Sequence, residues 1–534
     1  MISLIEPTTL RAWLGDGAEI ALIDVRDGGP FSRSHLLLAS NIPLAQLEVR
    51  IPALLPRRDV RLVLVDDGDG SCERAAFKLS SHGYTGLHIL SGGVAAWLAA
   101  GYELFSGTNV PSKAFGEMVE HAHETPRIEP QELKRWQVEG RDIVVVDARP
   151  LDEYRIVSIP GAADCPGAEL VLRIPGLLRS PATTVVVNCA GRTRSIIGCQ
   201  SLRNAGLPNP VVALKNGTMG WELAGFPAEH GRDNMVSEPV GSALEAALAL
   251  ADVVAKRHQV SFVTLAQVRA MQAQADRTTY VFDVRLADAF VAGHLPGSLN
   301  APGGQLVQAT DTFAPVRGAR IVLVDQHAVQ SVMTAHWMRQ MGWLDVHVLR
   351  DGLAGPLEVG PVAIPCLGES GLTAPMLEAS ALRPLLDAGA SGTRVIDVGE
   401  SYWYRAGRIP GSFYAMRSRL LDALGRFEVH TPLVFVCADG RVSRYAAQDA
   451  MDAGWSNVRV LAGGRAAWRA AGLPVERCTG DDDPLLLTPT DDMWYPPYAR
   501  RTGVQEAMQQ YLTWEVNLLQ QLEREPYLRF NLNT

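Results

Sequence analysis

The chain has 534 residues, of which 47% are hydrophobic and 20% are charged, and its net charge at pH 7 is −9. This composition is typical of a globular protein with large cores, and the length predicts three or four domains. The acidic balance does not favour nucleic-acid binding, and no apolar run of about 20 residues predicts a membrane span.

One order of motifs occurs four times along the chain. Each copy has an apolar run that ends in an aspartate, then an Ile-Pro or Leu-Pro turn, then a second apolar run. The aspartates are Asp24, Asp147, Asp283 and Asp397. Their spacing of roughly 115 to 135 residues is the size of a domain rather than of a solenoid repeat. We therefore expect four tandem domains, called copies 1 to 4, at residues 1–107, 126–232, 258–366 and 373–478, followed by a tail over 479–534.

Within each copy, strand-like runs alternate with helical segments such as 71–81 and 444–453. This alternation predicts an α/β fold in which helices cover a parallel sheet. Ligands of such sheets bind beyond the carboxyl ends of the strands. The loops that follow the second apolar run of each copy are therefore the candidate sites.

Two of these loops carry a cysteine between an apolar strand and a helix start. They are Cys189-Ala-Gly-Arg-Thr-Arg-Ser195 and Cys437-Ala-Asp-Gly-Arg-Val-Ser443, and the helices are expected to begin at Ile196 and Tyr445. A helix N-terminus stabilises a thiolate, so the pattern predicts a lowered cysteine pKa. The alternative is a buried structural cysteine, which a second matching loop makes less favourable.

The other two copies carry aspartates at the corresponding position, Asp66 in copy 1 and Asp325 in copy 3. A carboxylate is not a thiol-type nucleophile, so these copies are expected to be inactive. Cys72 lies six positions past Asp66, inside the helix start, and we interpret it as structural.

Together these motifs resemble the rhodanese, or sulfurtransferase, family. The resemblance is carried by the Asp-Val-Arg start, the Ile-Pro-Gly turn, the cysteine loop with Gly, Arg and Ser, and a closing Gly-Gly-x-x-x-Trp. It implies an α/β protein of four tandem rhodanese domains, each a central parallel sheet flanked by helices, with a helical C-terminal tail. The order inactive, active, inactive, active resembles a duplicated two-domain rhodanese, in which copies 1 and 3 would serve as packing partners and cleft walls.

The resemblance implies that Cys189 and Cys437 take a sulfane sulfur as a persulfide and pass it to a second nucleophile. Thiosulfate is the first choice of donor, followed by glutathione persulfide or another small persulfide, and the acceptor is a thiol or cyanide. The backbone N–H groups of the two loops would cradle the anionic sulfur. The expected substrate-binding residues are Ala190, Gly191, Arg192, Thr193, Arg194 and Ser195, and Ala438, Asp439, Gly440, Arg441, Val442 and Ser443.

The two loops differ in charge. Arg192 and Arg194 are suited to a sulfonate-like oxyanion, although a solvent-facing charge or a partner for Asp147 is the alternative. Copy 4 has Asp439 in its loop and Gly399 where the other copies have an arginine, so its field should be less positive. Asp147, Arg149 and Asp397 are expected to have structural roles. Two-domain relatives carry an anion-binding arginine where this chain has Glu153 and Trp403, which leaves the donor open.

Two other functions compete with sulfur transfer. A rhodanese-related phosphatase needs a larger loop that ends in an arginine six positions after the cysteine, but Ser195 and Ser443 stand there. A scaffold or sulfur-carrier protein without turnover is the second alternative, and two complete cysteine loops argue against it. The seven cysteines form no Cys-x-x-Cys pair, so neither a metal nor another cofactor is expected.

The segments between and after the copies complete the predictions. Residues 111–130, with His121 and His123, are expected to form a solvated linker, and 242–256 a helix between the two halves. Residues 504–524 are expected to form an amphipathic helix. Its apolar face either packs back on the body of the protein, or it covers an active cleft or mediates a homodimer. An odd number of cysteines and the lack of a secretion signal favour a cytoplasmic protein.

Overall fold

The computed structural model describes residues 2–387, 392–478, 480, 483–500, 502–525 and 527–532. Parts of copy 4 and of the tail, at 388–391, 479, 481, 482, 501, 526, 533 and 534, therefore lie outside the described residues. The described chain forms four sheets, one per copy, and every strand pair within a copy is parallel. The predicted α/β fold is confirmed.

The elements of copies 1 and 2 follow the same order. Copy 1 contains β1 (Ser3–Ile5), α1 (Pro7–Gly15), β2 (Ile20–Asp24), α2 (Gly28–Arg33), β3 (Ser40–Asn41), η1 (Leu44–Gln46), α3 (Leu47–Leu54), β4 (Leu62–Val65), α4 (Ser71–Ser81), β5 (Leu87–Leu90) and α5 (Gly93–Ala99). Copy 2 contains β6 (Arg127–Ile128), α7 (Pro130–Val138), β7 (Ile143–Asp147), α8 (Leu151–Ile156), β8 (Ala163–Asp164), η2 (Gly167–Glu169), α9 (Leu170–Arg173), η3 (Ile174–Gly176), β9 (Thr184–Asn188), α10 (Thr193–Asn204), β10 (Val211–Leu214) and α11 (Gly217–Leu223).

Copies 3 and 4 repeat this order with small changes. Copy 3 contains β11 (Ser261–Val263), α13 (Leu265–Gln272), β12 (Thr279–Asp283), α14 (Ala287–Ala292), β13 (Leu299–Asn300), α15 (Gly303–Gln308), α16 (Thr310–Phe313), β14 (Val316–Arg317), β15 (Arg320–Val324), α17 (Val329–Gln340) and β16 (Val346–Leu349). Copy 4, preceded by η4 (Glu369–Gly371), contains β17 (Met376–Leu377), α18 (Ala379–Asp387), β18 (Arg394–Asp397), α19 (Ser401–Ala406), β19 (Phe413–Tyr414), η5 (Arg417–Arg419), α20 (Leu420–Leu424), β20 (Leu433–Val436), α21 (Arg441–Asp452), β21 (Val458–Leu461) and α22 (Gly464–Ala470).

The central strand of each sheet carries the candidate loop at its carboxyl end. The strand order β6-β10-β9-β7-β8 of copy 2 recurs as β17-β21-β20-β18-β19 in copy 4. The central strands β9 and β20 are buried on both faces, since helices cover both sides of the sheet. The helices after them begin at Thr193 and Arg441, inside the cysteine loops and a few residues earlier than expected.

The copies pack in an order that their sequence does not indicate. Copy 2 packs on copy 3, where α10 and η2 contact α15 and α17. Copy 4 packs on copy 1, where the Arg417 guanidinium binds the Glu48 carboxylate at 2.9 Å. Copy 3 also contributes a strand to the sheet of copy 1, since β14 pairs antiparallel with β2 at the edge of that sheet. Each cysteine copy therefore has an aspartate copy as a partner, but the pairs are 2·3 and 4·1, whereas a simple duplication predicts 1·2 and 3·4.

The segment between copies 1 and 2 is a packed helix, α6 (Val110–His123), and not the solvated linker that was expected. Most of its first two turns is buried, because α6 lies between α10 and the tail helix α23 (Val504–Leu522). The predicted helix between the halves is α12 (Ser242–Arg257), which packs on α9 and α17.

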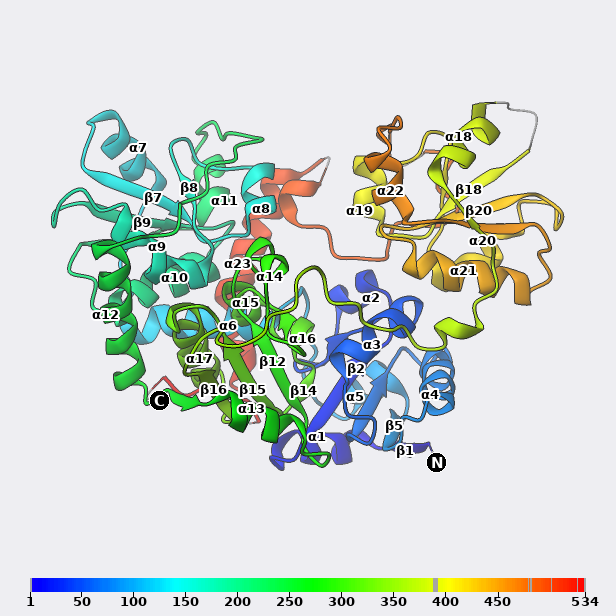
Figure 1. Ribbon diagram of the computed structural model, residues 1–534, viewed down its shortest axis with the longest axis horizontal. Coiled ribbons are helices and arrows are strands. Elements are labelled where there is room, and N and C mark those ends of the chain that lie inside the picture. The colour runs from blue at the N-terminus through cyan, green and yellow to red at the C-terminus, as the bar shows by residue number, and fades with distance from the viewer. Residues whose placement is uncertain are drawn as a thin grey trace.

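The C-terminal tail leaves copy 4 and crosses the molecule to copy 2. In Figure 1 the tail runs from the upper right, through the short η6 (Pro497–Ala499), to α23 near the centre. The apolar stripe of α23 lies on its own chain, where Met508 and Leu512 are buried against Ala190 and Met219 of copy 2. The tail thus packs back on the body, while the homodimer stays a prediction.

Candidate active site

The loop of copy 4 forms a cradle around its cysteine sulfur. The backbone N–H groups of Gly440 and Ser443 donate to Cys437 Sγ at 3.2 and 3.4 Å. Gly440 has a φ of 90°, a left-handed conformation that favours glycine and turns its N–H group inward. The loop is therefore a backbone nest of the kind that binds anions.

The aspartates of copies 1 and 3 lie in the same kind of cradle. Gly68 and Cys72 donate their N–H groups to the Asp66 carboxylate, both at 2.8 Å. Gln330 N–H and the Ser331 hydroxyl donate to Asp325 at 2.9 and 2.7 Å. In these copies a carboxylate occupies the anion nest, which supports the prediction that they do not carry sulfur.

Copy 2 holds Cys189 at the corresponding place. The backbone N–H and side chain of Ser195 both stabilise its thiolate, as the Ser443 N–H group does in copy 4. Cys189 and Cys437 are only 1% and 2% exposed. The structure thus brings each cysteine to a comparable loop beside Ser195 or Ser443.

The predicted lowering of the cysteine pKa is wrong for both residues in this structure. Burial raises the pKa of the Cys189 thiol, and the opposing effects of Arg194 and Ser195 are smaller. Burial also raises the pKa of the Cys437 thiol, against the effect of Ser443, and Asp439 raises it further. Helix position favours the thiolate, but the loss of water around the sulfur outweighs it.

The two arginines of the Cys189 loop are bound to carboxylates. Arg192 donates to both oxygens of Glu117 on α6, at 2.6 and 2.7 Å, and also to Glu120. Arg194 donates to both oxygens of Glu153 at 2.7 Å. Neither guanidinium is the solvent-facing charge or the Asp147 partner considered from the sequence. Their role as oxyanion ligands stays a prediction.

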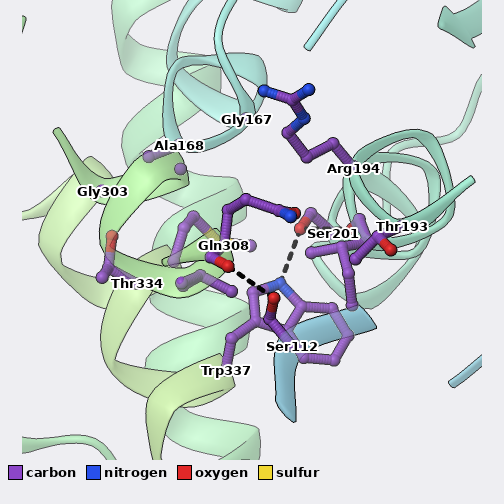
Figure 2. Close-up of a pocket in the computed structure, with 15 residues that line it drawn as sticks. Ser112, Gly167, Ala168, Thr193, Arg194, Ser201, Gly303, Gln308, Thr334 and Trp337 are labelled. Carbon is purple, nitrogen blue, oxygen red and sulfur yellow. Dashed lines mark hydrogen bonds between the residues drawn. The ribbon is translucent and has the colours of Figure 1, made fainter. Parts of the chain in front are cut away.

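Copy 3 contributes to the surroundings of Arg194. Its Gln305 Oε1 lies 3.5 Å from Arg194 Nη1. Next to this arginine, residues of α6, α10, η2, α15 and α17 line a cavity of about 30 Å³, and its labelled lining residues include Ser201, Gln308 and Trp337 (Figure 2). The guanidinium of Arg194 points away from the other labelled side chains. The small cavity is thus part of the contact between copies, and the charged head of Arg194 is directed elsewhere.

The Asp-x-Arg strand ends are structural, as expected. Arg149 is fully buried and donates to both Asp147 oxygens at 2.8 and 2.7 Å. In copy 4, where Gly399 replaces this arginine, Arg465 from α22 reaches Asp397 at 2.8 Å. The sequence pattern did not predict that Arg465 would replace the missing arginine. The only sign of it in the sequence is the arginine directly after Gly463-Gly464.

The first glycine of the closing helix lies against the backbone of each cysteine loop. A Cβ atom on Gly217 would lie 2.3 Å from the Cys189 carbonyl oxygen, and one on Gly464 would lie 2.4 Å from that of Cys437. Thr218 N–H donates to Cys189 O, and Arg465 N–H to Cys437 O, both at 2.8 Å. The Gly-x-x-x-Trp signature requires glycine at its first position because the closing helix approaches the loop backbone closely.

The tail covers one loop and leaves the other open. In the Cys189 loop, every residue except Arg194 is buried, and Arg194 is half-buried. Tyr511 and Leu512 of α23 lie directly over Gly191. In the Cys437 loop, Ala438, Asp439 and Arg441 are exposed. The sequence did not indicate which loop the tail would cover.

The tail also encloses a lysine close to the Cys189 site. Lys113 Nζ lies 4.8 to 5.3 Å from the rings of Trp494, Tyr511 and Trp514 and donates to the Thr108 carbonyl at 2.7 Å. Burial lowers the pKa of Lys113 to about 8. This cation–π contact helps to hold the tail on α6.

The described residues contain no group of three or more His, Cys, Asp or Glu side chains that could hold a metal ion. Among the same residues, no helix is long and apolar enough to cross a membrane.

These features define an α/β protein with four similar units, two of which end their central strand in a cysteine-bearing anion nest. The chain belongs to the rhodanese family. The model of the rhodanese-like domain matches residues 6–100, 129–224, 264–355 and 378–471. The four tandem rhodanese domains are thus confirmed, while their predicted boundaries stay predictions.

Three proteins illustrate the similarity. The crystal structure of a thiosulfate sulfurtransferase from Pseudomonas aeruginosa is 44% identical, with a TM-score of 0.91 and 99% of each chain covered. Thiosulfate sulfurtransferase from Azotobacter vinelandii is 25% identical over 213 residues, which are 36% of this chain and 77% of that protein. Thiosulfate sulfurtransferase GlpE from Pseudomonas paraeruginosa is 32% identical over 91 residues, 17% of this chain and 82% of that protein.

Proposed function

We propose that this protein is a sulfurtransferase that carries a sulfane sulfur as a persulfide on Cys189 and on Cys437. The observation that carries this proposal is the Cys437 cradle, in which the N–H groups of Gly440 and Ser443 both donate to the sulfur. The same donors suit the anionic terminal sulfur of a persulfide. The relatives named thiosulfate sulfurtransferase support the reaction class.

The reaction has two displacements. The cysteine thiolate attacks the outer sulfur of thiosulfate, a new S–S bond forms, and sulfite leaves with the electron pair of the broken bond. A thiol or cyanide then attacks the terminal sulfur of the persulfide, and the cysteine leaves as a thiolate. Glutathione persulfide is the second choice of donor.

The surroundings of the two cysteines differ in charge and in exposure, which supports different substrate preferences. At Cys189 the charges of Arg192 and Arg194 are offset by Glu117 and Glu153, so the advantage for an oxyanion is smaller than the sequence indicates. The Cys437 loop is open, which suits a larger acceptor. We propose small donors for Cys189 and bulkier sulfur partners for Cys437.

Intact-mass spectrometry tests the function. The full chain is treated with thiosulfate, or with glutathione persulfide, as Cys189→Ser, Cys437→Ser and the double variant. Each single variant should gain about 32 Da on the remaining loop cysteine, the mass of one sulfur atom, and the double variant should gain nothing. A scaffold without turnover predicts no adduct on any variant. That result with both donors would overturn the proposal.

A further inference from the structure

A carboxylate lies against the same loop position in both cysteine sites, and it comes from different parts of the chain. In copy 4 the residue two positions after the cysteine is Asp439, and Cys437 Sγ–H donates to its Oδ1 at 3.6 Å. In copy 2 that position is Gly191, which has no side chain. Glu515 Oε2 of α23 lies 3.1 Å from the point that a Cβ atom on Gly191 would occupy.

Glu515 is held firmly at this place. Its side chain is buried, and its Oε1 accepts hydrogen bonds from the Tyr511 hydroxyl at 2.9 Å and the Thr193 hydroxyl at 3.3 Å. Its other oxygen, Oε2, is buried without a hydrogen-bond partner among the described residues. A buried, unpartnered carboxylate oxygen is costly, so its presence over a reactive loop calls for a function.

We propose that Glu515 is the proton-handling carboxylate of the Cys189 site, supplied by the C-terminal helix where the Cys437 site uses Asp439. This inference rests on the proposed sulfur transfer. It explains why the tail crosses the molecule to copy 2 and why the covered loop carries glycine at the position of Asp439.

The proton transfers balance over the second displacement. An acceptor thiol gives its proton to the Glu515 carboxylate, and the resulting thiolate attacks the terminal sulfur of the Cys189 persulfide. A new S–S bond forms, the persulfide S–S bond breaks, and its electron pair goes to Cys189 Sγ. This sulfur then takes the proton back from Glu515. The acceptor leaves as a persulfide anion and Cys189 returns as a thiol.

The electrostatics of the pocket agree with this role. Burial raises the pKa of the Glu515 carboxyl, so it takes up a proton more readily than an exposed glutamate. Because burial also raises the pKa of the Cys189 thiol, the departing sulfur needs a proton. The charged and titratable groups that face Glu515 are Lys113 and Glu117 of α6, Arg192 of the loop and Tyr511 of α23.

The main test uses Glu515→Gln in the full chain with Cys437→Ser, so that Cys189 alone carries sulfur. Sulfur transfer from thiosulfate to a small thiol should fall about a hundredfold or more at neutral pH, as for loss of a general acid–base group. The acidic limb of the pH–rate profile should also disappear. Glu506→Gln, an exposed glutamate on the same helix, is the matched control and should leave both unchanged.

A second variant separates chemistry from folding. Gly191→Asp combined with Glu515→Ala moves the carboxylate into the loop, as in copy 4, and the alanine removes the 3.1 Å contact with the new Cβ. Gly191 is not among the glycines with positive φ, so its backbone conformation allows a side chain. The new Cβ would also lie 3.2 Å from Tyr511 Cε1, so the Tyr511 ring has to move by a few tenths of an ångström. Recovery of the rate and of the acidic limb is expected. A folded double variant as slow as Glu515→Gln, or a Glu515→Gln variant with unchanged rate and profile, would overturn the inference.

Alkylation of Cys189 distinguishes failure of the Glu515 inference from failure of the proposed sulfurtransferase function. The rate of iodoacetamide labelling of the Cys189 peptide depends on the thiolate and requires no sulfur transfer. Loss of the nearby negative charge in Glu515→Gln should shift the labelling profile to lower pH by about one unit. An unchanged profile contradicts the inference, whereas a shifted profile in a protein that never loads sulfur contradicts only the proposed function.

Discussion

The strand-end aspartate of each copy is paired with an arginine, but that arginine does not come from the same sequence position in every copy. Copies 1 to 3 pair the strand-end aspartate with an arginine two residues later, as Arg149 does with Asp147. In copy 4 the ion-pair partner of Asp397 is Arg465 of α22. The position of a charge is retained although its source in the sequence has changed.

Arg465→Thr, which introduces the residue that copy 2 has at the same position, should destabilise copy 4. It leaves the buried Asp397 carboxylate without its cation, a loss of about 3 kcal/mol or more. Urea unfolding followed by amide hydrogen exchange of β18 and β20 measures the effect.

The control is the double variant Gly399→Arg with Arg465→Thr, which restores the arrangement of the other copies. A Cβ on Gly399 would meet Arg465 Nη2 at 2.9 Å, and Arg465→Thr removes that contact. The double variant should recover most of the lost stability. If the double variant recovered no stability, Arg465 would not be the substitute for the arginine that the other copies carry two residues after the aspartate.

At the scale of elements, the sequence predicted what is local and missed what is brought together in space. The strand, cysteine loop and helix of copy 2 are contiguous, so the order of residues was sufficient to place Cys189 after β9. The partners of that loop are not contiguous. Glu117 is 75 residues from Arg192, and Glu515 is 322 residues from Thr193. The burial that raises the thiol pKa is likewise a tertiary effect, which local pattern does not contain.

We predict that the tail helix limits access to Cys189, and Leu512→Ala tests this prediction. Leu512 is 7% exposed and packs on the loop beside Ala190, so its truncation leaves a cavity under α23 and costs about 2 kcal/mol of local stability. A bulky maleimide should label Cys189 faster in this variant, with labelling of Cys437 unchanged. Val516→Ala, at a position 46% exposed on the same helix, is the control. Equal labelling of Cys189 in the two variants would show that α23 does not limit access.

At the scale of the whole molecule, four similar domains are arranged so that each cysteine copy packs on an aspartate copy other than the one that precedes it in the sequence. Sequence similarity indicated the four copies, but the copies resemble one another too closely for pattern to say which faces meet. Individual contacts between copies, such as Glu48 with Arg417 in pair 4·1, distinguish one interface from the other. The tail then connects the two pairs by running from copy 4 to the Cys189 loop (Figure 1).

The contact between copies 1 and 4 should weaken in acid. Although burial opposes it, the Arg417 guanidinium and the Lys78 ammonium lower the pKa of the Glu48 carboxyl to about 2, from an ordinary value of 4.5. A group with a depressed folded-state pKa contributes stability above its unfolded pKa, and that contribution is lost as pH falls from about 4.5 towards 2. Glu48→Gln removes it at every pH. Amide hydrogen exchange across Arg417–Arg419 and α20 should therefore be faster in Glu48→Gln than in the parent at pH 6, and the difference should shrink at pH 3. A difference that is the same at both pH values would show that the ion pair does not hold copy 4 on copy 1.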